Sequence, residues 1–242
     1  MNLIIDIGNT ATKLAVFQSD KMVKIQTVVT EQMFAVVELL LEAFPKIEQG
    51  LLSSVIIIDN SEVERLQKLL PIKILEASFK MPFKNCYDTP LTLGVDRLAL
   101  MAAAANQYPK TNVLVIDVGS CMTYDFMDAD QNYLGGAISP GIEMRYKSLE
   151  AFTSNLPLLQ KTPPNQRIGS STEASIHSGV VHGVIHEIEG VIKGYQDKYL
   201  DLTVILTGGD TEFLCKQFKI SIFANSNFLL EGLNFLLEYN SN

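Results

Sequence analysis

The sequence predicts an α/β protein built from two related domains. Its 242 residues are 47% hydrophobic, enough for one large core or for two domains of about 110 to 120 residues each. Near the start of each half, a short apolar run leads into an Asp-x-Gly turn, at 6–13 and at 117–123. Strand-like and helix-like segments alternate after each turn. We therefore expect domains at 1–110 and 111–242.

The first turn lies between the apolar runs 3–5 and 14–17. Both runs are rich in strand-forming residues and too short for helices. Residues 6–13 between them read Asp-Ile-Gly-Asn-Thr-Ala-Thr-Lys, with the glycine, asparagine and threonine that turns favour. The segment is therefore predicted to be a β-hairpin.

The residue types in this turn suit an anionic ligand. Gly8 lets the backbone approach a ligand closely. Backbone N–H groups, the hydroxyls of Thr10 and Thr12 and the ammonium of Lys13 can surround a phosphate. Asp6 would face a metal ion that accompanies the phosphate. The hairpin is therefore a candidate phosphate site.

The same order of residue types recurs at 113–126. Its aspartate, glycine and threonine, at positions 117, 119 and 123, each follow those of the first hairpin by 111 residues. One Asp-x-Gly is weak evidence, because both residues are common in turns. Two in matching order favour two domains that each contribute one acidic hairpin. At the position corresponding to Lys13 stands Tyr124, so the second hairpin lacks the positive charge of the first.

Composition narrows the classes of partner. A net charge of −8 without any Lys/Arg-rich run argues against nucleic acid. Met1 leads directly into a strand, and no apolar run approaches the roughly 18 residues that span a bilayer. Cys86, Cys121 and Cys215 lack the spacing of a disulfide framework or zinc site. We expect a cytoplasmic protein with reduced thiols and no membrane partner.

The first half is expected to continue as β-α-β-α-β after its hairpin. The predicted segments are a strand at 21–30, a helix from Thr30 to Pro45, a strand at 51–58, a helix from Ser61 to Leu70 and a strand at 72–75.

An alanine-rich helix at 98–108 follows the segment 85–97, and Asp96 and Arg97 fall in its first turn. An acidic residue there can simply be favourable to the helix dipole. A cation at the same end is mildly unfavourable, so Arg97 favours an anionic partner such as a ligand carboxylate held by two hydrogen bonds.

The second half is expected to hold a strand at 133–138, a helix at 142–152, a long loop at 157–171, a helix at 172–199 capped by Thr172 and a strand at 202–207. The loop is a candidate lid or binding loop. The last strand runs into Gly208-Gly209-Asp210 before another helix, which can offer a flat backbone surface to adenine or ribose. His182 and His186 have metal-compatible spacing but no evident third ligand, which favours a structural role.

Together these motifs resemble a known superfamily. Residues 6–13, 117–123 and 208–210 are similar to the two phosphate motifs and the adenosine motif of the actin, sugar-kinase and Hsp70 superfamily. Within it, 94–97 and 135–141 resemble type III pantothenate kinases. This resemblance implies two duplicated ribonuclease-H-like domains with the active-site cleft between them. It also implies a homodimer that phosphorylates pantothenate with ATP in the first step of coenzyme A synthesis.

The resemblance also implies roles for individual residues. ATP phosphates would be bound by Asp6, Ile7, Gly8, Asn9, Thr10, Ala11, Thr12 and Lys13, with a further ATP contact from Ser120. Pantothenate would be bound by Tyr87, Gly94, Val95, Asp96, Arg97 and Thr172, with Asp96 as general base. ATP would carry Mg²⁺, and Asp117 would hold a monovalent cation, potassium or ammonium. Ser120 replaces the family's usual threonine and retains its hydroxyl.

Two other functions fit the same motifs. A kinase of the superfamily that acts on a sugar or acetamido sugar would need no arginine for a substrate carboxylate. A non-catalytic regulator that keeps the fold could lose Asp96 or Lys13, yet both are present. Pantothenate kinase is therefore the favoured interpretation.

Overall fold

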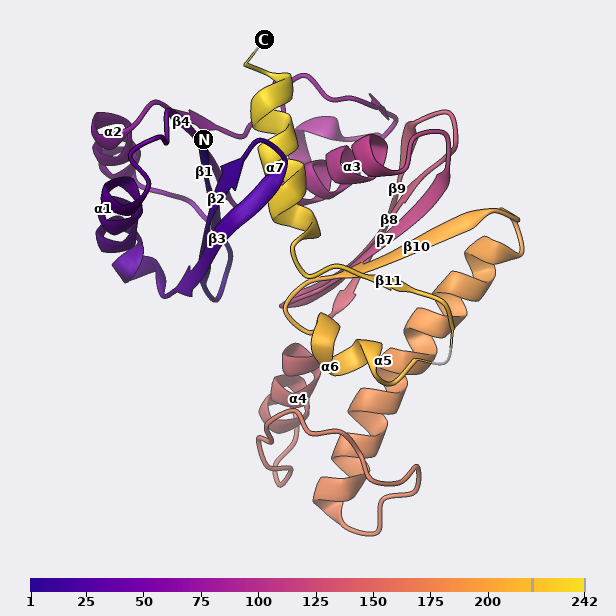
Figure 1. Cartoon of the computed structure of the whole chain (residues 1–242). Coiled ribbons are helices and arrows are strands. Elements are labelled where there is room, and N and C mark those ends of the chain that lie inside the picture. Colours follow the sequence, from indigo (N-terminus) through magenta and orange to yellow (C-terminus); the bar gives the residue numbers. More distant parts are fainter. Residues whose placement is uncertain (219, 242) are drawn as a thin grey trace. The chain divides into compact units, whose positions relative to one another are not determined.

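The computed structural model describes residues 1–218 and 220–241, and it confirms the predicted α/β class (Figure 1). The first half contains β1 (Asn2–Ile7), β2 (Thr12–Gln18), β3 (Lys21–Val28), η1 (Thr30–Gln32), α1 (Met33–Ala43), β4 (Gln49–Ser54), α2 (Asn60–Leu69), β5 (Ile72–Ile74), β6 (Lys84–Asn85), η2 (Pro90–Thr92) and α3 (Val95–Gln107). The second contains β7 (Asn112–Val118), β8 (Cys121–Met127), β9 (Asn132–Pro140), α4 (Ile142–Ala151), α5 (Thr172–Gln196), β10 (Leu202–Thr207), α6 (Thr211–Cys215), β11 (Phe223–Ala224) and α7 (Phe228–Tyr239). The predicted β-β-β-α-β-α-β order of the first half is confirmed.

The chain forms two compact units. The first comprises Met1–Pro109, Gln131–Tyr133 and the residues from Asn227 on, and the second comprises Lys110–Asp130 and Leu134–Ser226. The chain leaves the first unit near the boundary expected at residue 110, but α7 then packs with that unit. The continuous domains 1–110 and 111–242 stay a prediction.

The two sheets share one strand order, which supports the duplication inferred from the motifs. The first sheet has the order β3-β2-β1-β4-β5, and the second has the matching order β9-β8-β7-β10-β11, extended by β6 beside β9. In both sheets the hairpin strands are antiparallel, β1 with β2 and β7 with β8. The next strand along the sheet is parallel to the first in each case, β4 to β1 and β10 to β7.

Alternation along β1 determines what lies on each face of the first sheet. Leu3, Ile5 and Ile7 are buried in a core with residues of α1 and α2. Side chains alternate between the faces of a strand, so Asp6 lies on the same face as Asn2. The amide of Asn2 donates a hydrogen bond to Asn234 Oδ1 of α7 (2.8 Å). In Figure 1, α1 and α2 accordingly lie on one side of this sheet and α7 on the other.

Helices α3 and α7 pack together unusually closely. A Cβ at Gly232 of α7 would lie only 2.1 Å from Ala99 O and 3.1 Å from Ala103 Cβ of α3. The alanine-rich sequence of α3 is explained by this contact, because larger side chains would hold the helices apart. The packing fixes α3, and with it the first turn that carries Asp96.

In the second unit, α4 and α5 cover one face of the sheet. The buried cluster there combines Leu114, Ile116 and Val118 of β7 with Val184 and Ile188 of α5. By alternation, Asp117 lies on the opposite face of β7. The second predicted acidic turn is therefore supported from behind by a hydrophobic core.

Several predicted helix starts were wrong. The segment after β3 begins with a 3₁₀ turn, and Thr30 makes no capping bond, since its hydroxyl lies 3.1 Å from Thr12 Oγ1 instead. The cap of α2 is Asp59, whose Oδ1 accepts from Ser61 N (2.9 Å). In α2 two oxygen-bearing residues lie close together in the sequence, and sequence alone does not discriminate between them.

The cap of α5 and the length of one strand also differ from expectation. Ser171, not Thr172, caps α5 by accepting from Ala174 N (3.2 Å). The continuous strand expected at 51–58 ends at Ser54, whose hydroxyl donates to Ile56 O in a tight turn. Ile57 in this turn is 99% exposed, so the apolar run there does not reflect burial.

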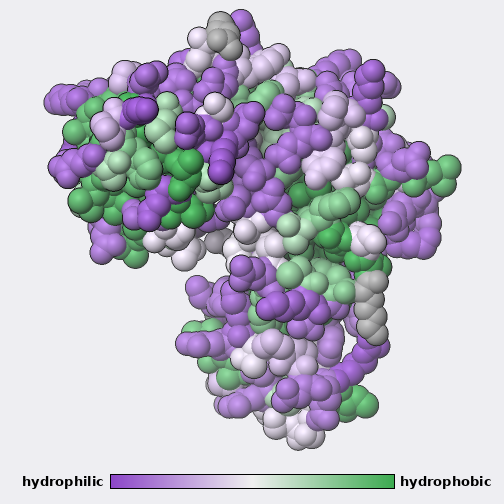
Figure 2. All heavy atoms as spheres, in the orientation of Figure 1, coloured by the Kyte–Doolittle hydropathy of each residue, from purple (hydrophilic) through white to green (hydrophobic). Residues whose placement is uncertain are grey.

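Exposed apolar side chains occur on the first unit. Figure 2 shows hydrophobic areas among hydrophilic ones on the face drawn. Val23 and Ile25 are exposed on β3, which is the edge strand of the first sheet. Among the described residues, no helix has both the length and the apolar character required to span a bilayer.

We expect Gly232→Ala to lower the free energy of unfolding by about 1–3 kcal/mol, because the added methyl group would overlap the backbone of α3. Urea unfolding monitored by circular dichroism measures this change. The matched control is Gly190→Ala in α5, where a Cβ meets nothing within 4 Å, and which should gain about 0.5–1 kcal/mol from helix propensity. Equal effects of the two substitutions would contradict the packing argument.

Candidate active site

The first predicted phosphate turn forms as expected. β1 and β2 pair with Asp6 opposite Lys13 and Ile7 opposite Thr12. Gly8 N donates to Ala11 O (3.1 Å) and closes the hairpin, which leaves Asn9 and Thr10 exposed at its tip. The tip therefore offers backbone N–H groups and two polar side chains to a ligand.

Two of the residues expected to bind ATP have buried side chains. Ile7 is 1% exposed and Thr12 is fully buried. The hydroxyl of Thr12 lies beside Thr30 Oγ1 within the protein. Any contact of these two residues with a nucleotide would have to come from their backbone atoms, whereas Asn9 and Thr10 can use side chains.

Asp6 is the carboxylate of this turn, and its pKa is strongly perturbed. Its side chain is only 7% exposed, and burial raises its pKa to about 6. Lys13 opposite lowers the pKa, and the negative charge of Asp96 raises it further. Asp6 at the end of β1 and Asp96 at the start of α3 are thus near enough to repel each other. The structure brings the phosphate turn and the expected general base together within the first unit.

The first turn of α3 holds its two predicted residues in fixed positions. Asp96 Oδ1 accepts a hydrogen bond from Arg97 N (2.8 Å). A Cβ at Gly94 would lie 2.4 Å from that same oxygen, so a larger residue there would displace the carboxylate of Asp96. The guanidinium of Arg97 lies over the ring of Tyr87, 5.4 Å from its centroid, and Arg97 is 6% exposed. Of the residues expected to bind substrate, Tyr87 and residues 94–97 are therefore neighbours.

Sequence reasoning missed one member of this group. Tyr133 stacks on Tyr87 with ring centroids 6.2 Å apart and an interplanar angle of 11°. Phe83 meets the edge of Tyr133 from another side, at 6.0 Å. Tyr133 reaches the first unit because β9 pairs with Asn85 of β6. No local pattern marks this pairing, since the two strands are separated by the whole of α3, β7 and β8.

The second hairpin differs from the first in strand pairing. Here Asp117 lies opposite Thr123, and Val118 lies opposite Met122, so the connecting turn is one residue shorter. The constant offset of 111 residues between the two motifs therefore does not predict which residues pair across the second hairpin. Tyr124 is not the structural counterpart of Lys13, because it points to the other face of the sheet, where it bonds to Glu187.

The second hairpin and the Gly-Gly-Asp motif are in direct contact. Gly208 has a φ of +98°, and a Cβ there would lie 2.3 Å from Asp117 Oδ1. Asp210 N donates to Val118 O (3.0 Å). The loop expected to act as a lid adds Lys161, which forms an ion pair with the buried Asp210. This lysine was not predicted, because its partner is 49 residues away.

The residues around Asp117 suit a hard cation. Thr123 Oγ1 is buried and has no hydrogen-bond partner among the described residues. A carboxylate and a hydroxyl on adjacent strands are oxygen donors, the type that potassium and magnesium prefer. The described part of the chain has no group of three or more His, Cys, Asp or Glu that could hold a metal, so the remaining ligands would be backbone, hydroxyl or nucleotide oxygens.

Thr172 lies in the second unit, at the first position of α5. It lines a pocket of about 920 Å³. The other lining residues are Arg145, Ser148, Leu149, Leu156, Gly169, Ser170, Ser171, Ser175, Ile176, Gly179 and Val180. The pocket combines hydroxyl groups, one guanidinium and apolar walls, as expected for a ligand with both polar and apolar parts.

The comparison with protein families shows the family to which this chain belongs. The family model for type III pantothenate kinase matches residues 2–194. The chain belongs to the type III pantothenate kinase family. The type III pantothenate kinase of Christiangramia forsetii is 52% identical over 99% of both chains. That of Flavobacterium johnsoniae is 44% identical over 99% of this chain and 98% of the relative.

Solved structures support the fold of this type III pantothenate kinase family member. A protein of Campylobacter jejuni described as a Baf family transcriptional activator has a TM-score of 0.66 at 22% identity, over 99% of both chains. Glucokinase from an Antarctic psychrotroph has a TM-score of 0.52 at 13% identity, over 98% of both chains. The predicted relationship to sugar kinases is thereby confirmed at the level of fold.

We expect Asp6→Asn to stabilise the protein at neutral pH and not at acid pH. The pKa of Asp6 is about 6 in the folded protein and about 3.8 in the unfolded chain. The contribution of Asp6 to the free energy of unfolding therefore falls as the pH rises from about 4 to about 6. Above pH 7 the gain from Asn should be on the order of 3 kcal/mol, and near pH 4 it should vanish. Melting temperatures of both proteins between pH 4 and 8 measure it. A difference that is constant across this range would show that Asp6 is not the titrating group.

Proposed function

We propose that this chain transfers the γ-phosphate of ATP to the hydroxyl of pantothenate, with Asp96 as the general base. The proximity of Asp96 to Asp6 carries this proposal. It places a partly exposed carboxylate next to the turn best suited to hold phosphate. In phosphoryl transfer, positioning and charge stabilisation dominate, and a base accepts the proton of the attacking hydroxyl.

The ATP phosphates are proposed to bind at the first turn, residues 6–13. The exposed tip supplies N–H groups, and Lys13 supplies a positive charge beside Asp6. Mg²⁺ carried by the nucleotide would neutralise charge on the phosphates, with Asp6 facing it. On the second hairpin, the exposed Ser120 would contact ATP, and Asp117 would bind potassium or ammonium with the help of Thr123.

Pantothenate is proposed to bind at Tyr87, at residues 94–97 and at Thr172. Arg97 would bind the substrate carboxylate, at the opposite end of the molecule from the reacting hydroxyl. Its guanidinium is already oriented by Tyr87, so little side-chain entropy would be lost on binding. The homodimer implied by the resemblance and the cytoplasmic location expected from the sequence remain part of this proposal.

A sugar or acetamido-sugar kinase is the second candidate, because glucokinase shares the fold. A non-catalytic regulator is the third, because the Campylobacter relative in fold is described as a transcriptional activator. Both similarities are below 25% identity, so they concern fold alone. The buried Arg97 beside Asp96 favours an acidic substrate over a neutral sugar.

We expect Asp96→Asn to fold normally and to lose turnover by about 10²–10⁴-fold, since an amide cannot accept the hydroxyl proton. Transfer of labelled phosphate from ATP to pantothenate measures the loss, with a panel of sugars assayed in parallel. The control is Asp88→Asn, an exposed acid outside the proposed site. Near-normal turnover of folded Asp96→Asn would leave Asp96 as a helix-terminal residue only. Transfer to a sugar instead of pantothenate would favour the second candidate.

We expect a pantothenate analogue with a neutral amide in place of its carboxylate to bind at least about tenfold more weakly, because Arg97 would lose a charged partner. Arg97→Lys keeps the charge but not the planar fork, so it should weaken pantothenate binding and affect the analogue much less. Calorimetric titration gives both affinities, and ATP affinity serves as the control. If the substitution weakens the binding of pantothenate and of the analogue equally, Arg97 does not bind the carboxylate.

A further inference from the structure

We propose that Arg145 and Glu187 are positioning residues that hold the second phosphate turn, residues 119–120, in its binding conformation through the segment 139–141. This inference rests on the proposed function, because it concerns how that turn binds nucleotide and cation. Neither residue belongs to a motif identified in the sequence, and both lie behind the turn.

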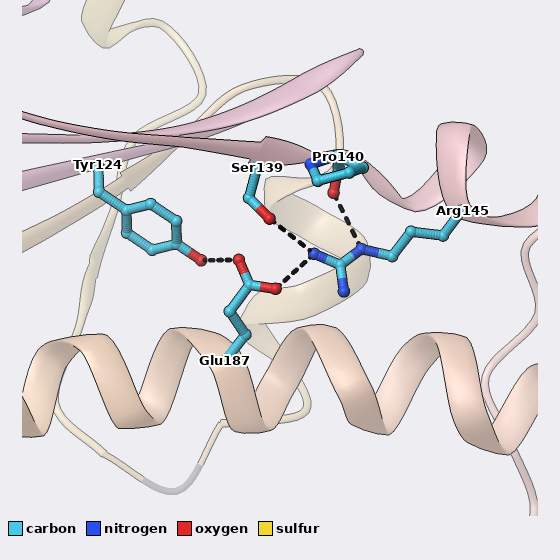
Figure 3. Close-up of polar contacts among 5 residues, drawn as sticks. All are labelled: Tyr124, Ser139, Pro140, Arg145 and Glu187. Carbon is cyan, nitrogen blue, oxygen red and sulfur yellow. Dashed lines mark hydrogen bonds and ion pairs between the residues drawn. The ribbon is translucent and has the colours of Figure 1, made fainter. Parts of the chain in front are cut away.

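The two residues form the centre of a polar network on the α5 face of the second sheet (Figure 3). Arg145 Nη2 donates to Glu187 Oε2 (2.5 Å) and to Ser139 Oγ (3.1 Å), while its Nε donates to Pro140 O (2.9 Å). Tyr124 OH donates to the other carboxylate oxygen, Glu187 Oε1 (3.0 Å). The network thus joins β8, the end of β9, α4 and α5.

The segment bound by Arg145 touches the turn directly. Gly141 N donates to Ser120 O (3.2 Å). A Cβ at Gly141 would lie 2.1 Å from Gly119 O and 2.6 Å from Ser120 O, so the two backbones are in van der Waals contact. Any outward movement of 139–141 would therefore remove the support of the turn.

Tyr124 provides a second connection to the same hairpin. It follows Thr123 in β8 and points to the opposite face, so the network cannot itself touch a ligand held by Asp117 and Thr123. Its effect on ligands must pass through the position of the strand and turn. This is the reason for describing Arg145 and Glu187 as positioning residues.

The residues of the network are better suited to fixing the position of the segment 139–141 than to stabilising the fold. Glu187 interrupts the apolar face of α5, between the buried Val184 and Ile188. Burial alone would raise the pKa of Glu187, but hydrogen bonds from Arg145, Ser139 and Tyr124 hold it below its usual value. Ion pairs in such places can often be replaced by apolar residues without loss of stability. The planar guanidinium of Arg145 donates to three acceptors and so fixes their relative positions, which the ammonium of a lysine cannot reproduce.

The test uses three small substitutions: Glu187→Gln, Arg145→Lys and Tyr124→Phe. Each removes one part of the network and nearly conserves volume. The matched control is Asp197→Asn, which breaks the exposed Lys193–Asp197 ion pair on the same helix. For every protein we would measure the melting temperature, the affinity for a non-hydrolysable ATP analogue, the KM for pantothenate and the potassium concentration that gives half-maximal activity.

We expect Glu187→Gln and Arg145→Lys to weaken the binding of the ATP analogue by about 10-fold or more. The potassium concentration that gives half-maximal activity should rise by a similar factor. Tyr124→Phe should give a smaller change of the same kind. The KM for pantothenate should change less than about twofold in Glu187→Gln and Tyr124→Phe, because neither residue lines the pocket of Thr172. The control should match the native protein. The Arg145→Lys/Glu187→Gln double variant should be no worse than the poorer single variant, because both act through one contact.

Unchanged affinity for the analogue in folded Glu187→Gln and Tyr124→Phe proteins would overturn the proposal. So would a uniform change in every constant that follows the fall in melting temperature, since that is the result of a purely structural role. Analogue binding requires no pantothenate. A native protein that binds the analogue but does not phosphorylate pantothenate would therefore contradict the proposed substrate without deciding the role of the network.

Discussion

The burial of Asp6 beside Asp96 is the constraint on which the first unit depends. The carboxylates of Asp6 in β1 and Asp96 in α3 repel each other, Asp6 is only 7% exposed, and Lys13 opposite Asp6 offsets part of this repulsion. Such an arrangement is unfavourable for folding alone and becomes favourable when cations arrive with a ligand. It persists because β1 lies in the sheet centre and α3 is fixed by its close packing on α7.

The two hairpins show how a duplicated element can diverge by one residue. A shorter second turn shifts strand pairing, and a shift of one residue reverses which face each side chain occupies. A lysine therefore faces the aspartate in the first hairpin, while a hydroxyl does so in the second. The first hairpin thus suits phosphate and the second suits a cation. Spacing in the sequence could not reveal this, because pairing depends on turn geometry as well as on residue order.

Local patterns predicted most of the fold. The hairpins, the alanine-rich α3 and the long α5 follow from periodicity and turn residues within each segment, and the resemblance brought together Asp96, Arg97 and Tyr87. Tyr133, Lys161 and Glu187 were missed. Each contacts a partner many residues away and lies in no repeated motif. The predicted caps of α2 and α5 were wrong by two residues and by one residue, because nearby serine, threonine and aspartate residues compete for the same N–H groups.

The position of Arg97 bears most directly on the kind of substrate. A guanidinium in the first turn of a helix meets the positive end of the helix dipole, and here it is also 6% exposed. The face of Tyr87 offsets part of this penalty, and Tyr133 holds that ring in place. A substrate carboxylate could accept hydrogen bonds from the guanidinium and would carry a charge of opposite sign, which a neutral sugar lacks. The same residues that are unfavourable for the free protein therefore favour an acidic substrate, and pantothenate is one.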